Sequence, residues 1–420
     1  MVERSKCMNV PEIRFKEFDE EWSENLLEDF FTKVTSKNRK LKYSAVLTNS
    51  AEYGIIGQLD YFDFDVTNSN NIGGYFIVEP DDFVYNPRVS VSAPVGPINR
   101  NRLGYTGIMS PLYLVFKING INKDFLCYYY KTKKWHRFMK LSGNCGARFD
   151  RLSISDDKFV KMPIIHPNNT KEQNQICKVF ENLDDLIEES TLHLVSLKRI
   201  KAASLQSMFP QEGETVPKVR FKGFEGEWEK EKLCNIASRI TRKNKNLESF
   251  TPLTLSAIEG LVSQLTYFNN IVASSNISGY YLIKNGEFAY NKSYSNGFPY
   301  GSIKRLDKFD TGVLSTLYIV FALNKQNTSI LSDYLVIFFN TTLWHHEIAK
   351  RAEEGARNHG LLNISAEDFL DINIIYPKDL LEQQKIASYF CNLDKQISLQ
   401  AQRLEKLKQI KSACLDKMFV

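Results

Sequence analysis

The chain carries the stretch VPEIRFK at residues 10–16 and repeats it, with two changes, as VPKVRFK at residues 216–222. A tryptophan follows each stretch at the same distance, Trp22 in the first case and Trp228 in the second. Similarity at a fixed period is typical of a structural unit that occurs more than once. The sequence therefore predicts a fold made of two copies of one unit.

Matched positions continue along both copies, so residues 10–209 return, with drift, as residues 216–419. The matched pairs include Gln58-Leu59 and Gln264-Leu265, Gly74-Tyr75 and Gly279-Tyr280, Ser110-x-Leu112-Tyr113 and Ser315-x-Leu317-Tyr318, Trp135-His136 and Trp344-His345, Gly146-Ala147-Arg148 and Gly355-Ala356-Arg357, and Met208-Phe209 and Met418-Phe419. The copies differ most in their polar and basic loops, at residues 87–106 and 292–311 and at residues 141–152 and 350–361.

The composition is that of a globular protein in solution. Of its 420 residues 43% are hydrophobic and 25% are charged, and no apolar run approaches the ~20 residues of a membrane helix. Seven scattered cysteines with no C-x-x-C pair favour reduced thiols over a disulfide scaffold or a zinc site. A net charge of +5 permits a nucleic-acid partner without requiring one. We expect a cytoplasmic protein that does not contact a membrane.

The first part of each copy has the pattern of strands and turns. Short runs of Phe, Tyr, Ile and Val, such as GYFIV at residues 74–78, alternate with Asn, Pro and Gly. Stretches without helix breakers, such as residues 124–140 and 332–351, predict helices. We therefore predict the α+β class for the domains at residues 1–166 and 211–376.

The second part of each copy, residues 167–210 and 377–420, begins at a proline and reads as one long helix. Its apolar residues are spaced by alternating steps of four and three, the 3.5-residue repeat of a coiled coil. They are Ile176, Phe180, Leu183, Ile187, Leu194, Leu197 and Met208, and then Ile386, Phe390, Leu393, Ile397, Leu404, Leu407, Cys414 and Met418. Each helix alone would leave its apolar stripe in water. We predict that the two pack on each other; the alternative is that each folds back on its own domain.

Sequence patterns of known catalytic sites do not occur. Nothing matches the phosphate-binding GxxxxGK[ST] and GxGxxG loops or the metal-binding HExxH helix, since His345-His346-Glu347 lacks the second histidine. Asn86-Pro87-Arg88 has only the start of the Asn/Asp-Pro-Pro-aromatic loop of base-methylating enzymes. Asp81 and Asp156 would suit a nuclease, but they lie far apart in the sequence. A binding or scaffolding role is therefore favoured.

Basic and amide side chains concentrate in the turn-rich parts of both copies. Such side chains read base edges and neutralise phosphates, so we predict that they bind DNA; ordinary solvated loops are the alternative. The candidates are Arg88, Asn99, Arg100, Arg102, Arg148 and Arg151, and then Lys292, Lys304, Arg305, Arg357, Asn358 and His359. Two diverged readers on a rigid spacer further predict a bipartite and asymmetric DNA site.

Over nearly its whole length the chain resembles the specificity (S) subunit of type I restriction–modification systems. The resemblance is carried by the tandem α+β units, by the openings at residues 11–22 and 217–228, and by the two Ser-x-Leu-Tyr motifs. Its most specific motif is Ile375-Tyr376-Pro377 followed by Glu382-Gln383 and a long helix, which recurs as Glu172-Gln173 in the first copy.

The resemblance implies two target-recognition domains, each reading one half of an asymmetric site in double-stranded DNA. It implies that the two long helices are conserved spacers that form an antiparallel coiled coil. It also implies a non-catalytic chain that assembles with two methyltransferase (modification) subunits and with restriction subunits that translocate DNA. S-adenosylmethionine, ATP and Mg are then expected on those partners, with no cofactor or metal on this chain.

Two other functions stay open on the residues alone. One is a stand-alone nuclease or methyltransferase with duplicated domains, and the other is an adaptor that uses the coiled coil without DNA. Cleavage or methylation of DNA by the purified chain alone would indicate the stand-alone enzyme rather than a non-catalytic subunit. Measuring DNA affinity at several salt concentrations distinguishes the adaptor from a DNA-binding subunit, because the affinity of a DNA-binding protein falls steeply with salt.

Overall fold

The computed structural model describes residues 9–58, 69–144, 150–270, 272–274, 276–326, 329–352 and 362–420. Contacts divide the chain into two units. The first unit is Met1–Thr191 together with Gln402–Val420, and the second is Leu192–Ala401. The predicted domain boundaries follow chain order, whereas the contacts assign a part of each long helix to each unit.

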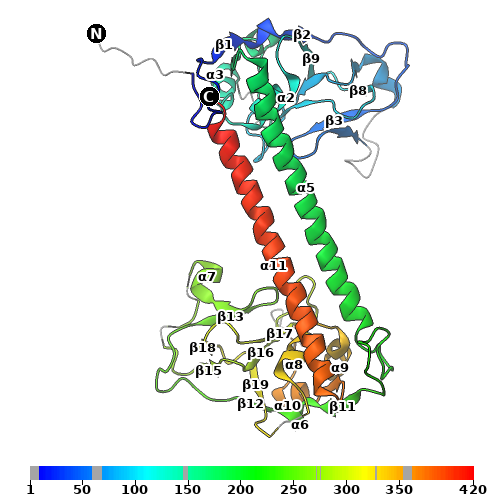
Figure 1. Ribbon diagram of the computed structural model, residues 1–420, viewed down its shortest axis with the longest axis vertical. Helices are drawn as coiled ribbons and strands as arrows, with labels where there is room; N and C mark the ends of the chain where they lie inside the picture. The colour runs from blue at the N-terminus through cyan, green and yellow to red at the C-terminus, as the bar shows by residue number, and fades with distance from the viewer. Residues whose placement is uncertain are drawn as a thin grey trace. The chain divides into compact units, whose positions relative to one another are not determined.

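The first unit is built on an antiparallel sheet with the strand order β2-β9-β6-β7. Among the described residues three antiparallel pairs accompany it, β1-β10, β3-β4 and β5-β8. The strands are β1 (Ser23–Leu26), β2 (Phe31–Lys33), β3 (Leu47–Ser50), β4 (Gly54–Gly57), β5 (Phe76–Val78), β6 (Phe83–Tyr85), β7 (Ile98–Arg100), β8 (Gly107–Met109), β9 (Leu114–Ile118) and β10 (Pro163–His166) (Figure 1).

The second unit repeats this topology strand for strand. Its sheet has the order β12-β19-β16-β17, and its pairs are β11-β20, β13-β14 and β15-β18. The register also repeats: Phe83 of β6 pairs with Phe116, and Phe288 of β16 pairs with Phe321. The strands are β11 (Glu229–Lys232), β12 (Ala237–Arg239), β13 (Leu253–Ser256), β14 (Gly260–Ser263), β15 (Tyr281–Lys284), β16 (Phe288–Asn291), β17 (Ser302–Arg305), β18 (Thr311–Leu314), β19 (Ile319–Leu323) and β20 (Asn373–Tyr376). The predicted duplication and α+β class are confirmed.

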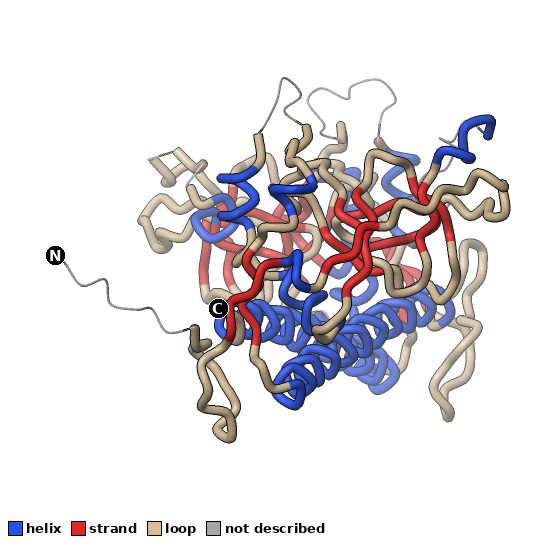
Figure 2. The backbone as a smooth tube through the Cα atoms, turned by 90° about the horizontal axis from the view of Figure 1, so that it is seen from above, coloured by secondary structure: helices blue, strands red, loops and turns tan. Residues whose placement is uncertain are grey.

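Helices connect the strands of both units. In the first they are the 3-10 helices η1 (Leu27–Asp29) and η2 (Ser69–Gly74), then α2 (Lys123–Lys131), α3 (His136–Ser142), α4 (Asp156–Phe159) and α5 (Thr170–Ser207). The later ones are α6 (Leu233–Ile236), α7 (Gln264–Phe268), α8 (Ser332–Phe338), α9 (Leu343–Arg351), α10 (Ala366–Leu370) and α11 (Leu380–Lys417). In each unit the strands lie to one side of α5 and α11 (Figure 2). No helix in the described part of the chain has the length and apolarity needed to cross a membrane.

The stretches predicted to be helical, residues 124–140 and 332–351, each contain two helices, α2 and α3 in the first and α8 and α9 in the second. The Thr132 hydroxyl donates to the Tyr129 carbonyl at 2.7 Å, and the Thr341 hydroxyl makes the equivalent bond to Phe338 at 2.7 Å. A side chain that bonds to the preceding turn competes with the next backbone bond. The first helix of each pair therefore ends at the same place in both units, so the predicted helices are present and each stretch contains a break.

The long helices pair antiparallel, as predicted. Every apolar seam position named from the sequence is buried or half-buried. In the second unit Lys201 of α5 forms an ion pair with Asp394 of α11, and the Ser204 hydroxyl bonds that of Tyr389 at 2.9 Å. In the first unit Lys411 of α11 forms an ion pair with Asp184 of α5. Lys201 and Lys411, which the same spacing of four and three places in the seam, are thus neutralised by the opposite helix.

The end of one long helix completes the core of each unit. Phe419, just after α11, is 1% exposed in the first unit, with its ring centroid 5.2 Å from that of Phe125 and 5.8 Å from that of Phe180. Phe209, just after α5, fills the matching place in the second unit, 5.7 Å from Trp228. The repeated Met-Phe motif is therefore a core element.

A buried ion pair explains two of the repeated motifs together. The Arg14 guanidinium of the opening stretch donates to both carboxylate oxygens of Glu172 on α5, at 2.7 and 2.9 Å. Arg220 does the same to Glu382 on α11, at 2.7 and 2.8 Å. The hydrogen bonds to Glu172 raise the pKa of Arg14. A bidentate, buried pair of this kind fixes the opening stretch to the start of each long helix.

Glu172→Gln is expected to destabilise the first unit by about 3 kcal/mol, because it leaves the Arg14 charge buried without its partner. Urea unfolding measures the change. Glu28→Gln is the matched control, since Glu28 forms an exposed ion pair with Lys161 that should contribute less than about 1 kcal/mol. Equal effects of the two substitutions would contradict a structural role for the Arg14–Glu172 pair.

Candidate nucleic-acid interface

Two adjoining clefts lie on the first unit. The β9 cleft, of 330 Å³, runs along β9 and past Lys33, Phe76, Tyr85 and Asp156. The β3 cleft, of 450 Å³, runs along β3 and past Asn86, Arg88, Ser90 and Ser110. Pro87, Leu112, Tyr113 and Arg151 line both clefts. We call the two together the first-unit groove.

Asparagine side chains fix the wall of the β3 cleft. The Asn86 amide donates to the Asn49 carbonyl at 2.9 Å, and the Asn99 amide donates to the Asn49 side-chain oxygen at 2.7 Å. Asn99 also donates to the Ser50 carbonyl at 3.1 Å. These bonds join β3 to β7 and to the residue that follows β6. The side-chain amide of Asn99, a predicted DNA-binding residue, is therefore hydrogen-bonded within the cleft wall. Its contact with DNA stays a prediction.

Two of the predicted DNA-binding residues are brought together in this groove. Arg88 and Arg151 face each other in an antiparallel β-bridge, although they lie far apart in the sequence. The Leu152 amide donates to the Pro87 carbonyl at 2.9 Å, and the Val89 amide to the Asp150 carbonyl at 2.9 Å. Within the described residues Arg88 has no carboxylate partner, and Arg151 approaches Asp150 only at 3.9 Å. Arg88 is exposed and Arg151 is half-buried, and both side chains line the β3 cleft.

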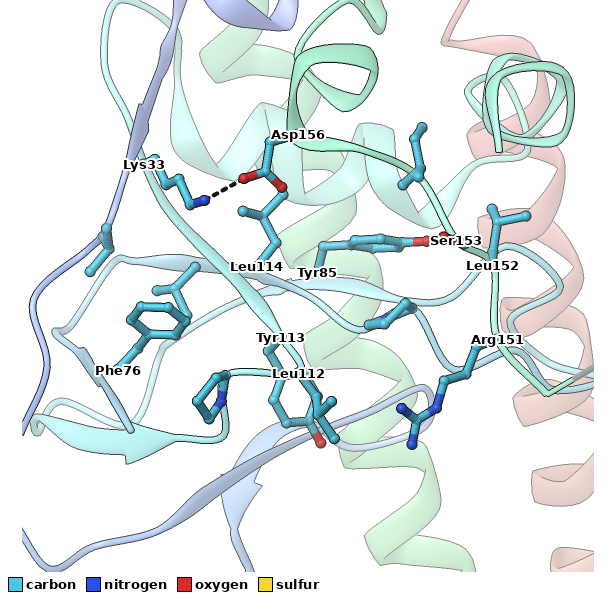
Figure 3. A pocket seen from close by; sticks show the side chains of 15 residues that line it. Lys33, Phe76, Tyr85, Leu112, Tyr113, Leu114, Arg151, Leu152, Ser153 and Asp156 are labelled. Carbon is cyan, nitrogen blue, oxygen red and sulfur yellow. Dashed lines mark hydrogen bonds and ion pairs between the residues drawn. The ribbon is translucent and has the colours of Figure 1, made fainter. Parts of the chain in front are cut away.

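An ion pair between Lys33 and Asp156 lies at the far end of the β9 cleft from Arg151 (Figure 3). The second unit has a similar pair, Arg239 with Glu367, at 3.4 Å. Asp81 also has a cation partner, because Arg100 donates to it at 2.8 Å and lowers its pKa. Both aspartates considered for a nuclease are thus held in ion pairs.

Three other candidates bind carboxylates within their own unit. Arg100 joins β7 to α2 through Asp124 and also pairs with Asp81, which precedes β6, and Arg102 pairs with the same Asp124. Arg305 of β17 repeats the pair with the helix through Asp333 of α8 at 2.7 Å, and it also pairs with Asp307 at 2.6 Å. Since Arg100 and Arg305 occupy matching places in two diverged units, their ion pairs with Asp124 and Asp333 belong to the shared scaffold. A DNA contact by any of the three stays a prediction.

The second unit holds two further candidates. The Lys304 ammonium donates to the Asn340 side chain at 2.9 Å, and burial together with nearby Lys201 lowers its pKa. Lys292 donates to the Ile364 carbonyl at 3.4 Å. Four candidates lie outside the described residues: Arg148, Arg357, Asn358 and His359.

The loops between β6 and β7 and between β16 and β17 contain the same glycine turn in both units. Gly96 and Gly301 have positive φ, +80° and +77°, and a Cβ on either would lie 2.1 Å from the carbonyl oxygen of Asn86 or Asn291. Only glycine fits such a turn without a shift of the backbone. Buried tyrosines bond back to the turn, Tyr85 to the Val95 carbonyl at 3.0 Å and Tyr290 to the Tyr300 carbonyl at 2.9 Å. Different loop sequences are thus carried by one frame.

Sequence reasoning missed several residues of the groove. Asn49 and Thr48 of β3 and Tyr113 were not among the candidates, yet they line it. The repeated Ser-x-Leu-Tyr motif was a usable signal, because it places Tyr113 and Tyr318 at equivalent positions.

Comparison with known proteins finds a family that matches part of the chain and solved structures with a similar fold. Residues 19–196 match the family described as "Type I restriction modification DNA specificity domain". The chain is similar to the crystal structure of the type I restriction–modification system S subunit from M. genitalium, with a TM-score of 0.56, 14% identity and coverage of 98% of this chain and 99% of that one. It is also similar to a structure described as "Structural basis underlying complex assembly and conformational transition of the type I R-M system", with a TM-score of 0.50, 13% identity and coverage of 94% and 97%. The fold is thus shared over nearly the whole chain.

Proposed function

We propose that this chain is a specificity subunit of a type I restriction–modification system, and that each of its units reads one half of an asymmetric, bipartite site in double-stranded DNA. A specificity-domain family matches residues 19–196, and the fold of a solved S subunit extends over nearly the whole chain. The family works with DNA and with the other subunits of a restriction–modification complex. One observation carries the proposal: the same frame occurs twice with different loops. Arg88 of the first copy corresponds to Ser293 of the second, and Pro87 corresponds to Lys292.

The rest of the assembly follows as part of the proposal. Helices α5 and α11 set the distance between the half-sites and dock two methyltransferase subunits and the restriction subunits. The chain itself performs no catalysis and binds no cofactor, while the partners bind S-adenosylmethionine, ATP and Mg in the cytoplasm. Methylation or cleavage of DNA by the purified chain alone would contradict this division. An adaptor that does not use DNA would lack the steep salt dependence expected of phosphate contacts.

Arg88→Ala and Arg151→Ala test the interface directly in the complex with the modification subunits. Each substitution should weaken binding to the cognate duplex by about tenfold, with the salt slope reduced by about one if the side chain contacts a phosphate. Fluorescence anisotropy at several salt concentrations measures both quantities. Lys161→Ala is the control, because Lys161 is an exposed cation that lines neither cleft. Full affinity in the double variant would exclude the first-unit groove as the DNA interface.

Removing one heptad from each long helix should shorten the gap between the half-sites by about three base pairs. Seven helical residues span about 10 Å, and one base pair about 3.4 Å. The deletions are centred on Ser190 and Gln400, which occupy matching seam positions. Methylome sequencing of cells carrying the variant measures the gap. Glu189→Ala, which keeps the helix length, should leave the gap unchanged, and an unchanged gap in the deletion variant would mean that the helices do not set it.

A further inference from the structure

One apolar side chain is kept exposed at the same place in both units. Leu112 and Leu317 are the leucines of the repeated Ser-x-Leu-Tyr motifs, and each is 60% exposed. The two loops that contain most of the candidate residues diverged between the copies, whereas this leucine did not. An exposed leucine on its own is ordinary. Its retention in two diverged copies indicates an action that both units perform in the same way.

The leucine is held by a turn with the same hydrogen bonds in both units. The Tyr113 amide donates to the Ser110 carbonyl at 3.1 Å, and the Tyr318 amide to the Ser315 carbonyl at 3.2 Å. The leucine amides lie 3.4 and 3.3 Å from the hydroxyl oxygens of the same serines.

The tyrosine of each motif ties the turn to the neighbouring hairpin. The Tyr113 hydroxyl lies 3.2 Å from that of Thr48 on β3, and the Tyr318 hydroxyl lies 3.4 Å from that of Thr254 on β13. A side chain on a turn that hydrogen bonds hold in place is already oriented before binding. This lowers the entropic cost of inserting it into a ligand.

The surroundings of Leu112 favour DNA as that ligand. Leu112 and Arg151 line the β9 cleft (Figure 3), and both also line the β3 cleft together with Arg88. An apolar side chain flanked by guanidinium groups suits a duplex, in which stacked bases lie between two rows of phosphates.

We propose that Leu112 and Leu317 are wedges that insert between neighbouring bases, one in each half-site. The proposal rests on the proposed function and deepens it. Apolar wedges separate stacked bases and thereby distort the duplex, and they do so with little dependence on sequence. That explains why both units keep leucine while the residues around it differ. The loops would contact the base edges of each half-site, and the leucine would separate two of its stacked bases.

The test uses the complex with its modification subunits and duplexes that carry 2-aminopurine in place of adenine at successive positions of both half-sites. Fluorescence of 2-aminopurine rises when it is unstacked. We expect Leu112→Ala to abolish the rise at a position in the first half-site, to leave the second half-site unchanged, and to weaken binding by about tenfold. Leu317→Ala should do the reverse. Leu112→Met should restore most of the signal, and Leu41→Ala, which changes a leucine of the same unit that is 62% exposed and lines neither cleft, should have no effect.

The possible results separate the wedge from the function on which it rests. If the unaltered complex binds its bipartite site and Leu112→Ala leaves affinity and fluorescence unchanged, the wedge is wrong and the proposed function stands. If Leu112→Ala instead impairs assembly with the modification subunits and leaves the fluorescence unchanged, the leucine is a protein contact and the wedge is again wrong. If the unaltered complex binds no specific DNA, the proposed function itself fails, and the wedge fails with it.

Discussion

Phe419→Ala is expected to destabilise the first unit by about 4 kcal/mol, because it empties a closely packed aromatic site. Phe419 is 1% exposed, and its ring lies near those of Phe125, Tyr129 and Phe180. Urea unfolding followed by hydrogen exchange at peptide resolution measures the loss and locates it in residues 9–191.

Phe209→Ala makes the same change in the second unit and should locate the loss there instead, since Phe209 packs on Trp228 and Tyr334. Ile410→Ala is the surface control on α11, where the side chain is 39% exposed, and it should change stability by less than about 0.5 kcal/mol. If Phe419→Ala behaves like Ile410→Ala, the helix end is not a core element of the first unit.

Exchange of residues 1–166 for the corresponding domain of another specificity subunit is expected to replace one half of the recognised site completely. The other half and the gap should stay as they are, because residues 211–376 and both helices are unchanged. Methylome sequencing of cells with the matching modification subunits gives both halves in one experiment.

The exchanged domain must keep an aromatic environment for Phe419, which contacts Phe125 and Tyr129 of the domain being replaced. The reciprocal exchange of residues 211–376 is the matched control and should change only the opposite half. A change in both halves after either exchange would contradict the assignment of one half to each unit.

The sequence predicted well those features that follow from local periodicity. Burial on a helix repeats every three or four residues, so the spacing of Ile176, Phe180 and Leu183 was enough to predict a seam. Duplication made the prediction firmer, because the same spacing occurs at Ile386, Phe390 and Leu393. The strands of both units were predicted as a class from their aromatic and β-branched runs.

Features that depend on contacts between distant residues could not be predicted in this way. Both Arg14 and Glu172 stood out as repeated residues, but nothing in a linear pattern says that they pair. Arg100 and Arg305 have the composition of DNA-binding residues, and only the folded strands bring them to Asp81, Asp124 and Asp333. Arg88 and Arg151 show the opposite case, since folding brings two separate candidates into one groove.

We propose that the same structural frame occurs in both units and holds two sets of loops that read different DNA sequences. Methylome sequencing of a cell that carries the unaltered chain with its modification subunits tests it most directly. We expect a single methylated motif composed of two unlike half-sites separated by a gap of fixed length. A continuous motif, or two identical half-sites, would contradict the claim.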